Sequence, residues 1–281
     1  MRRNRLSDFR NLRASGLIAM KLDENDHLIG VATCRDGDDA LLATRRGRCL
    51  RFQITDDQVR VFAGRESSGV RGIKLGGDDR VISLSILRHV EASVAERTAY
   101  LRLAAARRRT GEDETEVEAD TSEPEESVEE TALTAERVAE LEAAEDILLV
   151  VTDRGFGKRS SAYDYRVTGR GGQGIANLML SARTGTEVVA TLPVLPNSDV
   201  MLVTDGGRLI RVPVDQVRIS ARQTMGVTLL RLNADERVGS VFPVLEDDTD
   251  ETSDGAAVAP DGHPVGQPDG ESDGYPGEEP V

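Results

Sequence analysis

A unit of about 50 residues recurs along this chain and constrains its fold more than any other feature. Each unit has a turn that ends in glycine and is followed by an apolar segment, at Gly16, Gly69, Gly174 and Gly226. The first two glycines lie 53 residues apart and the last two 52, whereas the middle two lie 105 apart because extra sequence intervenes. A fixed period of this length indicates a solenoid, a propeller or an array. Such a chain can present one surface several times over.

Within each unit the pattern is that of β-strands joined by polar turns. An alternating segment follows each glycine, and a β-branched segment follows the next polar turn; these strands are expected at residues 17–22 and 28–31, 70–75 and 81–84, 175–180 and 188–191, and 227–232 and 238–241. Tight hairpins with a glycine at the turn lie between units, at residues 41–52, 148–159 and 201–212. Residues 1–6 resemble the second half of a hairpin whose first half is missing. Four strands per unit in a radial array predict an all-β, propeller-like fold.

Charge and composition divide the chain into parts. We expect blades over 1–88 and 147–245, a partly disordered insert over 89–146, and a disordered acidic tail over 246–281. Residues 112–146 hold 16 acidic residues and one basic residue, and residues 246–281 hold 12 acidic residues and no basic one. Segments of this composition bury too little apolar surface to offset the entropy of ordering.

Two short helices are expected inside the insert. Ser93 with Glu96 reads as a capping box that opens a helix reaching Arg109. Thr134 is a suitable cap for a second helix over 135–144. We interpret the insert as a surface elaboration between two blades, and a dedicated function is the alternative.

The formal net charge of −15 hides a basic body. Without the two acidic segments, 34 basic residues face 22 acidic ones. A basic excess on a fold suggests a polyanion partner, usually nucleic acid, although scattered cations can also serve only to solvate a surface.

Cations recur at matching places in the units, after the hairpin turns and around the glycine turns. If the units are related by rotation about one axis, such positions line one rim, and arginine suits phosphate because its planar fork donates two hydrogen bonds. The predicted DNA-binding residues are Arg45, Arg46, Arg48, Arg51, Arg65, Arg71, Lys158, Arg159, Arg166, Arg170, Arg208, Arg211, Arg218 and Arg222.

The glycine-rich turn Gly169-Arg170-Gly171-Gly172-Gln173-Gly174 is the sharpest local motif. It could bring backbone N–H groups close to a phosphate, or it could be a simple tight turn. It lacks the lysine and hydroxyl of a nucleotide-binding loop, so a nucleotide site is not expected.

No catalytic or metal-binding constellation is apparent. The three histidines lie far apart, and Cys34 and Cys49 have neither metal-ligand spacing nor a disulfide framework, so we expect two reduced thiols, half-buried on strands. Tyr163 and Tyr165 alternate as on a strand, where packing is the expected role. Without a secretory signal or an apolar run of about 18 residues, a cytoplasmic protein with no membrane contact is expected.

Residues 157–174 and 202–229, with the repeats that contain them, resemble the C-terminal domain of the A subunit of bacterial DNA gyrase. The resemblance covers residues 1–88 and 146–245, and the helical insert with its acidic linker is similar to the alphaproteobacterial form. It implies a β-pinwheel, in which neighbouring blades exchange strands, with about four blades present here. It also implies that duplex DNA wraps around a basic rim, in support of ATP-dependent negative supercoiling by a complex of gyrase A and gyrase B.

The chain departs from that family in three respects. The catalytic tyrosine domain is absent, so no catalytic residue is assigned and this chain alone is expected to be inactive; ATP and Mg²⁺ would belong to other parts of the complex. The repeats match the last four of the usual six blades. The turn at 169–174 resembles the gyrase box but occupies a later blade. The C-terminal domain of topoisomerase IV and a propeller used as a protein-interaction platform are the alternatives.

Overall fold

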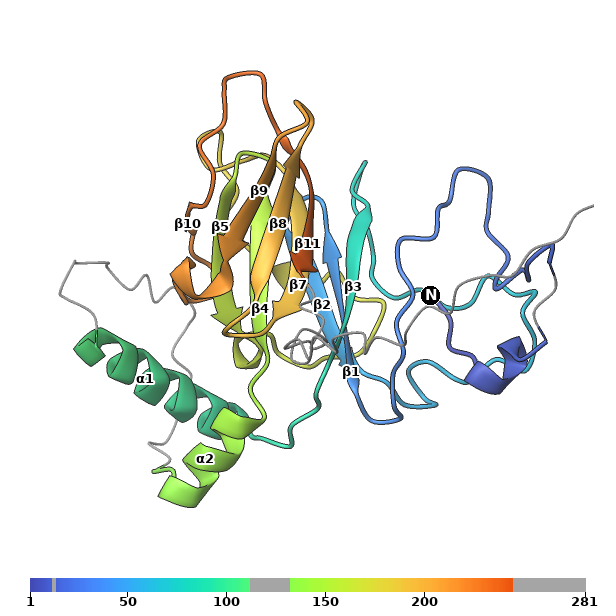
Figure 1. Ribbon diagram of the computed structural model, residues 1–281. Coiled ribbons are helices and arrows are strands. Elements are labelled where there is room, and N and C mark those ends of the chain that lie inside the picture. Colours follow the sequence, from blue (N-terminus) through green and yellow to red (C-terminus); the bar gives the residue numbers. More distant parts are fainter. Residues whose placement is uncertain (12–13, 112–131, 245–281) are drawn as a thin grey trace, which may run out of the picture. The chain divides into compact units, whose positions relative to one another are not determined.

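The computed structural model describes residues 1–11, 14–111 and 132–244, and its β-strands form three antiparallel sheets (Figure 1). Sheet 1 has the order β3-β1-β2-β6, in which β1 spans Asp39–Thr44, β2 Arg48–Gln53, β3 Val81–Leu87 and β6 Ile175–Ala176. The hairpin β1–β2 is therefore flanked by strands that come from two later units.

Sheets 2 and 3 repeat this plan. Sheet 2 has the order β10-β5-β4-β7, with strands β4 (Ile147–Thr152), β5 (Phe156–Ser161), β7 (Val188–Val194) and β10 (Val227–Thr228). Sheet 3 has the order β11-β8-β9, with strands β8 (Asp199–Thr204), β9 (Leu209–Pro213) and β11 (Val238–Val244). Each hairpin thus receives its inner strand from the next unit, and the first two hairpins also receive a two-residue outer strand from the unit after that. The predicted β-pinwheel is confirmed.

The outer strands depend on glycine at the turn. Gly174 and Gly226 have φ of +70° and +80° and precede β6 and β10. A Cβ at Gly174 would lie inside 3.0 Å of the carbonyl oxygen of Cys49, and one at Gly226 would meet the carbonyl oxygen of Gly157 in the same way. Only glycine combines this backbone angle with so close an approach between two chain segments.

All three hairpins close with the same turn. In each, a threonine hydroxyl accepts a hydrogen bond from the backbone N–H four residues later: Thr44 from Arg48 at 3.1 Å, Thr152 from Phe156 at 3.2 Å, and Thr204 from Arg208 at 3.1 Å. The threonine carbonyl also accepts from the glycine N–H within each turn. The repeat predicted from sequence therefore extends to individual hydrogen bonds.

The core lies between successive sheets. β4 reads Ile-Leu-Leu-Val-Val-Thr and is buried on both faces, because sheets 1 and 3 pack against opposite sides of sheet 2. Leu148 packs with Leu41 and Cys49 of sheet 1, whereas Leu149 packs with Leu202 of sheet 3. β3 contacts β7, and β7 contacts β11, so the innermost strands of the three sheets follow one another.

Two α-helices interrupt the repeat. α1 spans Val94–Gly111 and α2 spans Ala135–Ala143. Both predicted caps are confirmed: Ser93 and Glu96 exchange side-chain-to-backbone bonds of 2.8 and 3.1 Å, and Thr134 accepts from the Arg137 N–H at 3.2 Å. The helices are anchored to sheet 2 through Tyr163, which meets Tyr100 of α1 edge to face.

Several expectations from sequence are wrong in detail. Residues 14–35 form no strand, although strands were expected at 17–22 and 28–31. Tyr163 lies in the 3₁₀ helix η2 (Ala162–Asp164) rather than on a strand. Cys34 is exposed and off any strand, while Cys49 is fully buried on β2. Two further 3₁₀ helices are η1 (Leu6–Phe9) and η3 (Val214–Gln216).

The acidic linker at 112–131 and the acidic tail from residue 246 lie outside the described residues, so the disorder expected there stays a prediction. Among the described residues no helix is both long and apolar enough to cross a membrane.

Candidate nucleic-acid interface

The second strand of each hairpin carries an arginine at an equivalent position, Arg51, Arg159 and Arg211, and residues 1–5 carry Arg3. Parallel bridges fix the equivalence: Arg3 pairs with Val61, Arg51 with Val167 and Arg159 with Ile219.

Arg51 is buried with 4% exposure, so the expectation that it faces DNA is wrong. Its Nε donates to Asp39 at 2.7 Å, and a terminal nitrogen donates to the carbonyl of Ala162 at 2.6 Å. A charge removed from water needs such partners, and these contacts join sheet 1 to η2.

Arg159 and Arg211 also bind the protein itself. Arg159 donates to the carbonyls of Val217 at 2.5 Å and Asp215 at 3.0 Å. Arg211 forms an ion pair with Asp199 on the neighbouring strand. This position of the repeat therefore serves to hold segments of the fold together.

Lys158 and Arg222 form a second buried set and likewise correct the expectation of exposure. Lys158 is 1% exposed, and its Nζ donates to the carbonyls of Ala221, at 2.9 Å, and Arg222. Arg222 is 8% exposed and donates to the carbonyls of Asp164, at 3.1 Å, and Ala176. Burial lowers the pKa of Lys158 to about 7 and raises that of Asp164. These cations stabilise the joint where β10 enters sheet 2.

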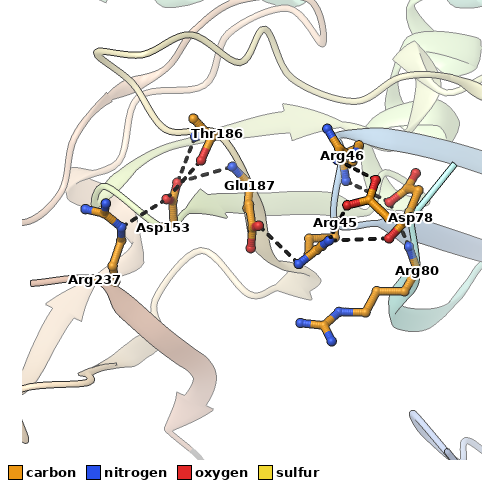
Figure 2. Close-up of polar contacts among 9 residues, drawn as sticks. Arg45, Arg46, Asp78, Arg80, Asp153, Thr186, Glu187 and Arg237 are labelled. Carbon is orange, nitrogen blue, oxygen red and sulfur yellow. Dashed lines mark hydrogen bonds and ion pairs between the residues drawn. The ribbon is translucent and has the colours of Figure 1, made fainter. Parts of the chain in front are cut away.

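The arginines at the first hairpin turn are held by carboxylates, as Figure 2 shows. Arg45 lies 3.3 Å from Asp78 and 3.1 Å from Glu187, and Arg46 pairs with Asp78. Since Glu187 precedes β7, the Arg45 pair links the turn of sheet 1 to sheet 2.

A carboxylate takes the place of Arg45 at the second hairpin turn. Asp153 accepts from the N–H of Thr186 at 3.0 Å and lies 3.6 Å from Arg237, just before β11 (Figure 2). The turns of neighbouring sheets are therefore joined by charges of alternating sign, and the arginines there are largely neutralised within the protein.

Three more predicted cations bind backbone or a carboxylate. Arg48 donates to the carbonyl of Gly174 at 2.6 Å, and Arg170 to that of Arg71 at 3.0 Å. Arg208 pairs with Glu236 at 2.8 Å while keeping 41% exposure. Arg48 and Arg208 are thus accessible at the surface as well as structurally engaged.

The glycine-rich turn packs on the preceding unit. The N–H of Gly171 donates to the carbonyl of Gly72 at 2.5 Å, and the N–H of Arg170 donates to the Gln58 side chain at 3.0 Å. Two N–H groups that a phosphate would need are therefore already occupied. Of the alternatives for Gly169, Gly171, Gly172 and Gly174, the tight structural turn agrees with these contacts.

The remaining predicted cations are accessible. Arg71, Arg166 and Arg218 are exposed and Arg65 is half-buried, and the side chains of these four form no hydrogen bond or ion pair with another described residue. Arg166 and Arg218 each stand directly before the residue that forms the parallel bridge, Val167 and Ile219.

Arg60 occupies the same place before Val61; it is exposed, and its guanidinium lies 4.8 Å from the ring centroid of Phe62. We call Arg60, Arg166 and Arg218 the edge arginines. Successive units therefore each present one exposed arginine beside the outer strand of a hairpin.

Sequence reasoning missed another repeated cation. Lys21, Lys74 and Arg231 each lie five residues after a turn glycine, and all are exposed. Aligning the units on their glycines would have found them, but attention to the hairpins and turns left this strand position out.

The described residues contain no group of histidine, cysteine and carboxylate side chains that could hold a metal ion. His89 contacts Asp39 at 2.8 Å and is part of the buried arrangement around Arg51. No arrangement for nucleophilic or acid–base catalysis emerges from these contacts.

Comparison with known proteins agrees with this architecture. The family model described as DNA gyrase C-terminal domain, beta-propeller, matches residues 1–35, 38–88, 146–194 and 198–244, which is more than half of the chain. The chain belongs to the DNA gyrase C-terminal domain family. The match omits most of the insert that carries α1 and α2.

Relatives of this gyrase domain bear the name of the DNA gyrase A subunit. That of Granulibacter bethesdensis is 65% identical over 271 residues, covering 93% of this chain and 29% of the relative. That of Rickettsia bellii is 42% identical, covering 90% of this chain and 27% of the relative. The chain thus spans less than a third of the length of these relatives.

Two solved structures share the fold. The C-terminal domain of DNA topoisomerase IV superposes with a TM-score of 0.59 at 17% identity, covering 84% of this chain and 56% of that one. The DNA gyrase A C-terminal domain superposes with a TM-score of 0.57 at 18% identity, covering 85% and 60%. At these identities they show the fold alone, and the named relatives favour gyrase over the topoisomerase IV alternative.

Proposed function

We propose that this chain binds and wraps duplex DNA without sequence preference, as the C-terminal part of gyrase A. In that setting it would support ATP-dependent negative supercoiling together with the rest of gyrase A and with gyrase B, in the cytoplasm. Catalysis, ATP and Mg²⁺ would belong to other parts of the complex.

The observation that carries the proposal is the series of edge arginines. Arg60, Arg166 and Arg218 stand at one structural position in successive units, are exposed, and form no ion pair with another described residue. Regular spacing along an edge suits the regular spacing of phosphates, and such contacts position a duplex without reading its sequence. Arg71 and the strand cations Lys74 and Arg231 are further candidates for the same track.

Distributed contacts also suit a bent duplex. Bending a 20–30 base-pair site by 40–90° costs on the order of 1–6 kcal/mol in elastic estimates. Counterions released at each neutralised phosphate can offset this cost when several units contact the same molecule. A repeat that turns the chain between units gives a duplex several such contacts along a curved edge.

The test is the salt dependence of binding to a fluorescent random duplex of about one hundred base pairs, a length above the single-site range. Replacing Arg60, Arg166 and Arg218 together by glutamine should weaken binding and reduce the slope of log K against log salt by about 0.9 for each lost contact. Plasmid relaxation in the presence of the protein would report wrapping as a shift in linking number.

The matched control replaces Arg35, Arg102 and Arg109 by glutamine. This variant has the same net charge and alters exposed arginines away from the hairpin edges. Equal losses for the two triple variants would indicate a general charge effect, and an unchanged slope for the edge variant would contradict the proposal. Weak binding that does not depend on salt would favour the protein-interaction platform.

A further inference from the structure

Sheet 3 lacks the outer strand that sheets 1 and 2 possess. β6 pairs with the start of β2, with Ile175 opposite Cys49, and β10 pairs with the start of β5, with Val227 opposite Gly157. The equivalent residue of β9 is Leu209, and no described strand pairs with the outer side of β9. Leu209 is 64% exposed, whereas Cys49 is fully buried.

A third filled slot shows what the pairing consists of. Met1 is equivalent to Cys49, and its amino nitrogen and its carbonyl both bond to Val70, each at 2.8 Å. Gly69, directly before Val70, has φ of +87° and lies against the carbonyl of Met1. A filled slot therefore combines a strand-edge carbonyl with a glycine at positive φ that is followed by an aliphatic residue.

The chain also contains the matching strand without a slot. Gly16 has φ of +76°, like Gly69, Gly174 and Gly226, and it is followed by Leu17. A Cβ at Gly16 would meet no described atom within 4 Å, whereas at the other three glycines it would overlap a carbonyl oxygen. The turn thus has the geometry of an outer strand, but no described strand edge faces it.

We propose that the outer strand at Gly16–Ile18 of one copy of this chain adds to the open edge of β9 in a second copy. The two surfaces lie at different places on the chain, so the contact is head-to-tail. Unpaired strand edges are ready templates for addition of a strand, and Gly16–Ile18 reproduces the residue pattern that fills the other slots. Leu209 would exchange its backbone bonds with Leu17, as Met1 does with Val70.

Two variants remove the two halves of this contact separately. Gly16→Val denies the turn its positive φ, and Gly37→Val is the matched control, since Gly37 has φ of +92° and the same open surroundings. Leu209→Pro removes the N–H at the open edge, a substitution that edge strands tolerate where that N–H is unpaired. Circular dichroism and urea unfolding would verify that each variant folds.

Sedimentation of the full chain without DNA is the measurement. The wild-type chain and Gly37→Val should show a concentration-dependent mass above the 30.4 kDa of one chain. Gly16→Val and Leu209→Pro alone should each remain at the mass of one chain. An equimolar mixture of these two variants should associate again as a pair, because one retains the β9 edge and the other retains the outer strand.

Two results would overturn the proposal. One is a wild-type chain that stays at the mass of one copy at every concentration. The other is association only after removal of residues 245–281, which would mean that the C-terminal segment of the same chain fills the β9 edge. Since no DNA is present, neither result bears on DNA binding.

Discussion

Arg51 and Asp39 form an ion pair inside sheet 1, with their side chains 4% and 0% exposed and a nitrogen–oxygen distance of 2.7 Å. Asp39 also contacts His89 at 2.8 Å, and Arg51 reaches the carbonyl of Ala162. A residue type chosen from sequence as a phosphate ligand is therefore part of the core. The consequences for stability and reactivity can be measured.

Replacing Arg51 by methionine should destabilise the fold, because Asp39 would be left buried without its cation. Removing one partner of a buried pair costs roughly 3–5 kcal/mol, and urea unfolding at neutral pH would measure the loss. Arg166→Met is the control, since its exposed side chain makes the change within about 0.5 kcal/mol. A stable Arg51 variant with weakened DNA binding would instead mean that this arginine faces the duplex.

Lys158→Met should change how stability depends on pH. Burial lowers the pKa of Lys158 to about 7 from 10.5, so from pH 7 upward the native state releases a proton that the unfolded state keeps. The wild-type free energy of unfolding should therefore rise relative to the methionine variant between pH 7 and 9 and run parallel to it below pH 6.

Urea unfolding of wild-type and Lys158→Met chains at pH 5.5, 7, 8 and 9 would show this divergence. Cys49, whose pKa burial raises to about 12, opposes the trend in both chains equally and cancels in the comparison. Parallel curves over the whole range would contradict the lowered pKa.

Gly174→Ala should destabilise the joint between sheets 1 and 2. Gly174 has φ of +70°, and an added Cβ would overlap the carbonyl oxygen of Cys49. A strained backbone of this kind costs on the order of 1–3 kcal/mol, to which the steric overlap adds. Gly172→Ala in the same turn is the control, since its nearest contact is 3.9 Å from Leu50. Thermal unfolding that is equal for both variants would contradict this role.

The two thiols should differ in reactivity. Cys34 is exposed, whereas Cys49 is buried on β2 with its pKa raised to about 12. A thiol-specific reagent at pH 8 should modify one cysteine in the native chain and both after unfolding, because the thiolate is the reacting form. Cys34→Ser should abolish the native reaction, and rapid labelling of that variant would show that β2 opens readily.

The repeat itself was readable from sequence. Glycines at 16, 69, 174 and 226 mark positions where a left-handed backbone is needed, and the alternating segments predict strands by a local rule. The same holds for both helix caps, because a cap depends on residues three positions apart. Local geometry, repeated, was sufficient for the fold class.

The role of each cation was decided by tertiary structure. Arg51, Arg159 and Arg166 look alike in sequence, yet Arg51 is buried, Arg159 binds carbonyls of η3 and its neighbour Val217, and only Arg166 is exposed without a described partner. Burial and pairing depend on segments from later units, such as β6 and β10, that sequence spacing does not bring together. The sequence by itself determined which units repeat, whereas strand exchange between units determined which charges remain for a partner.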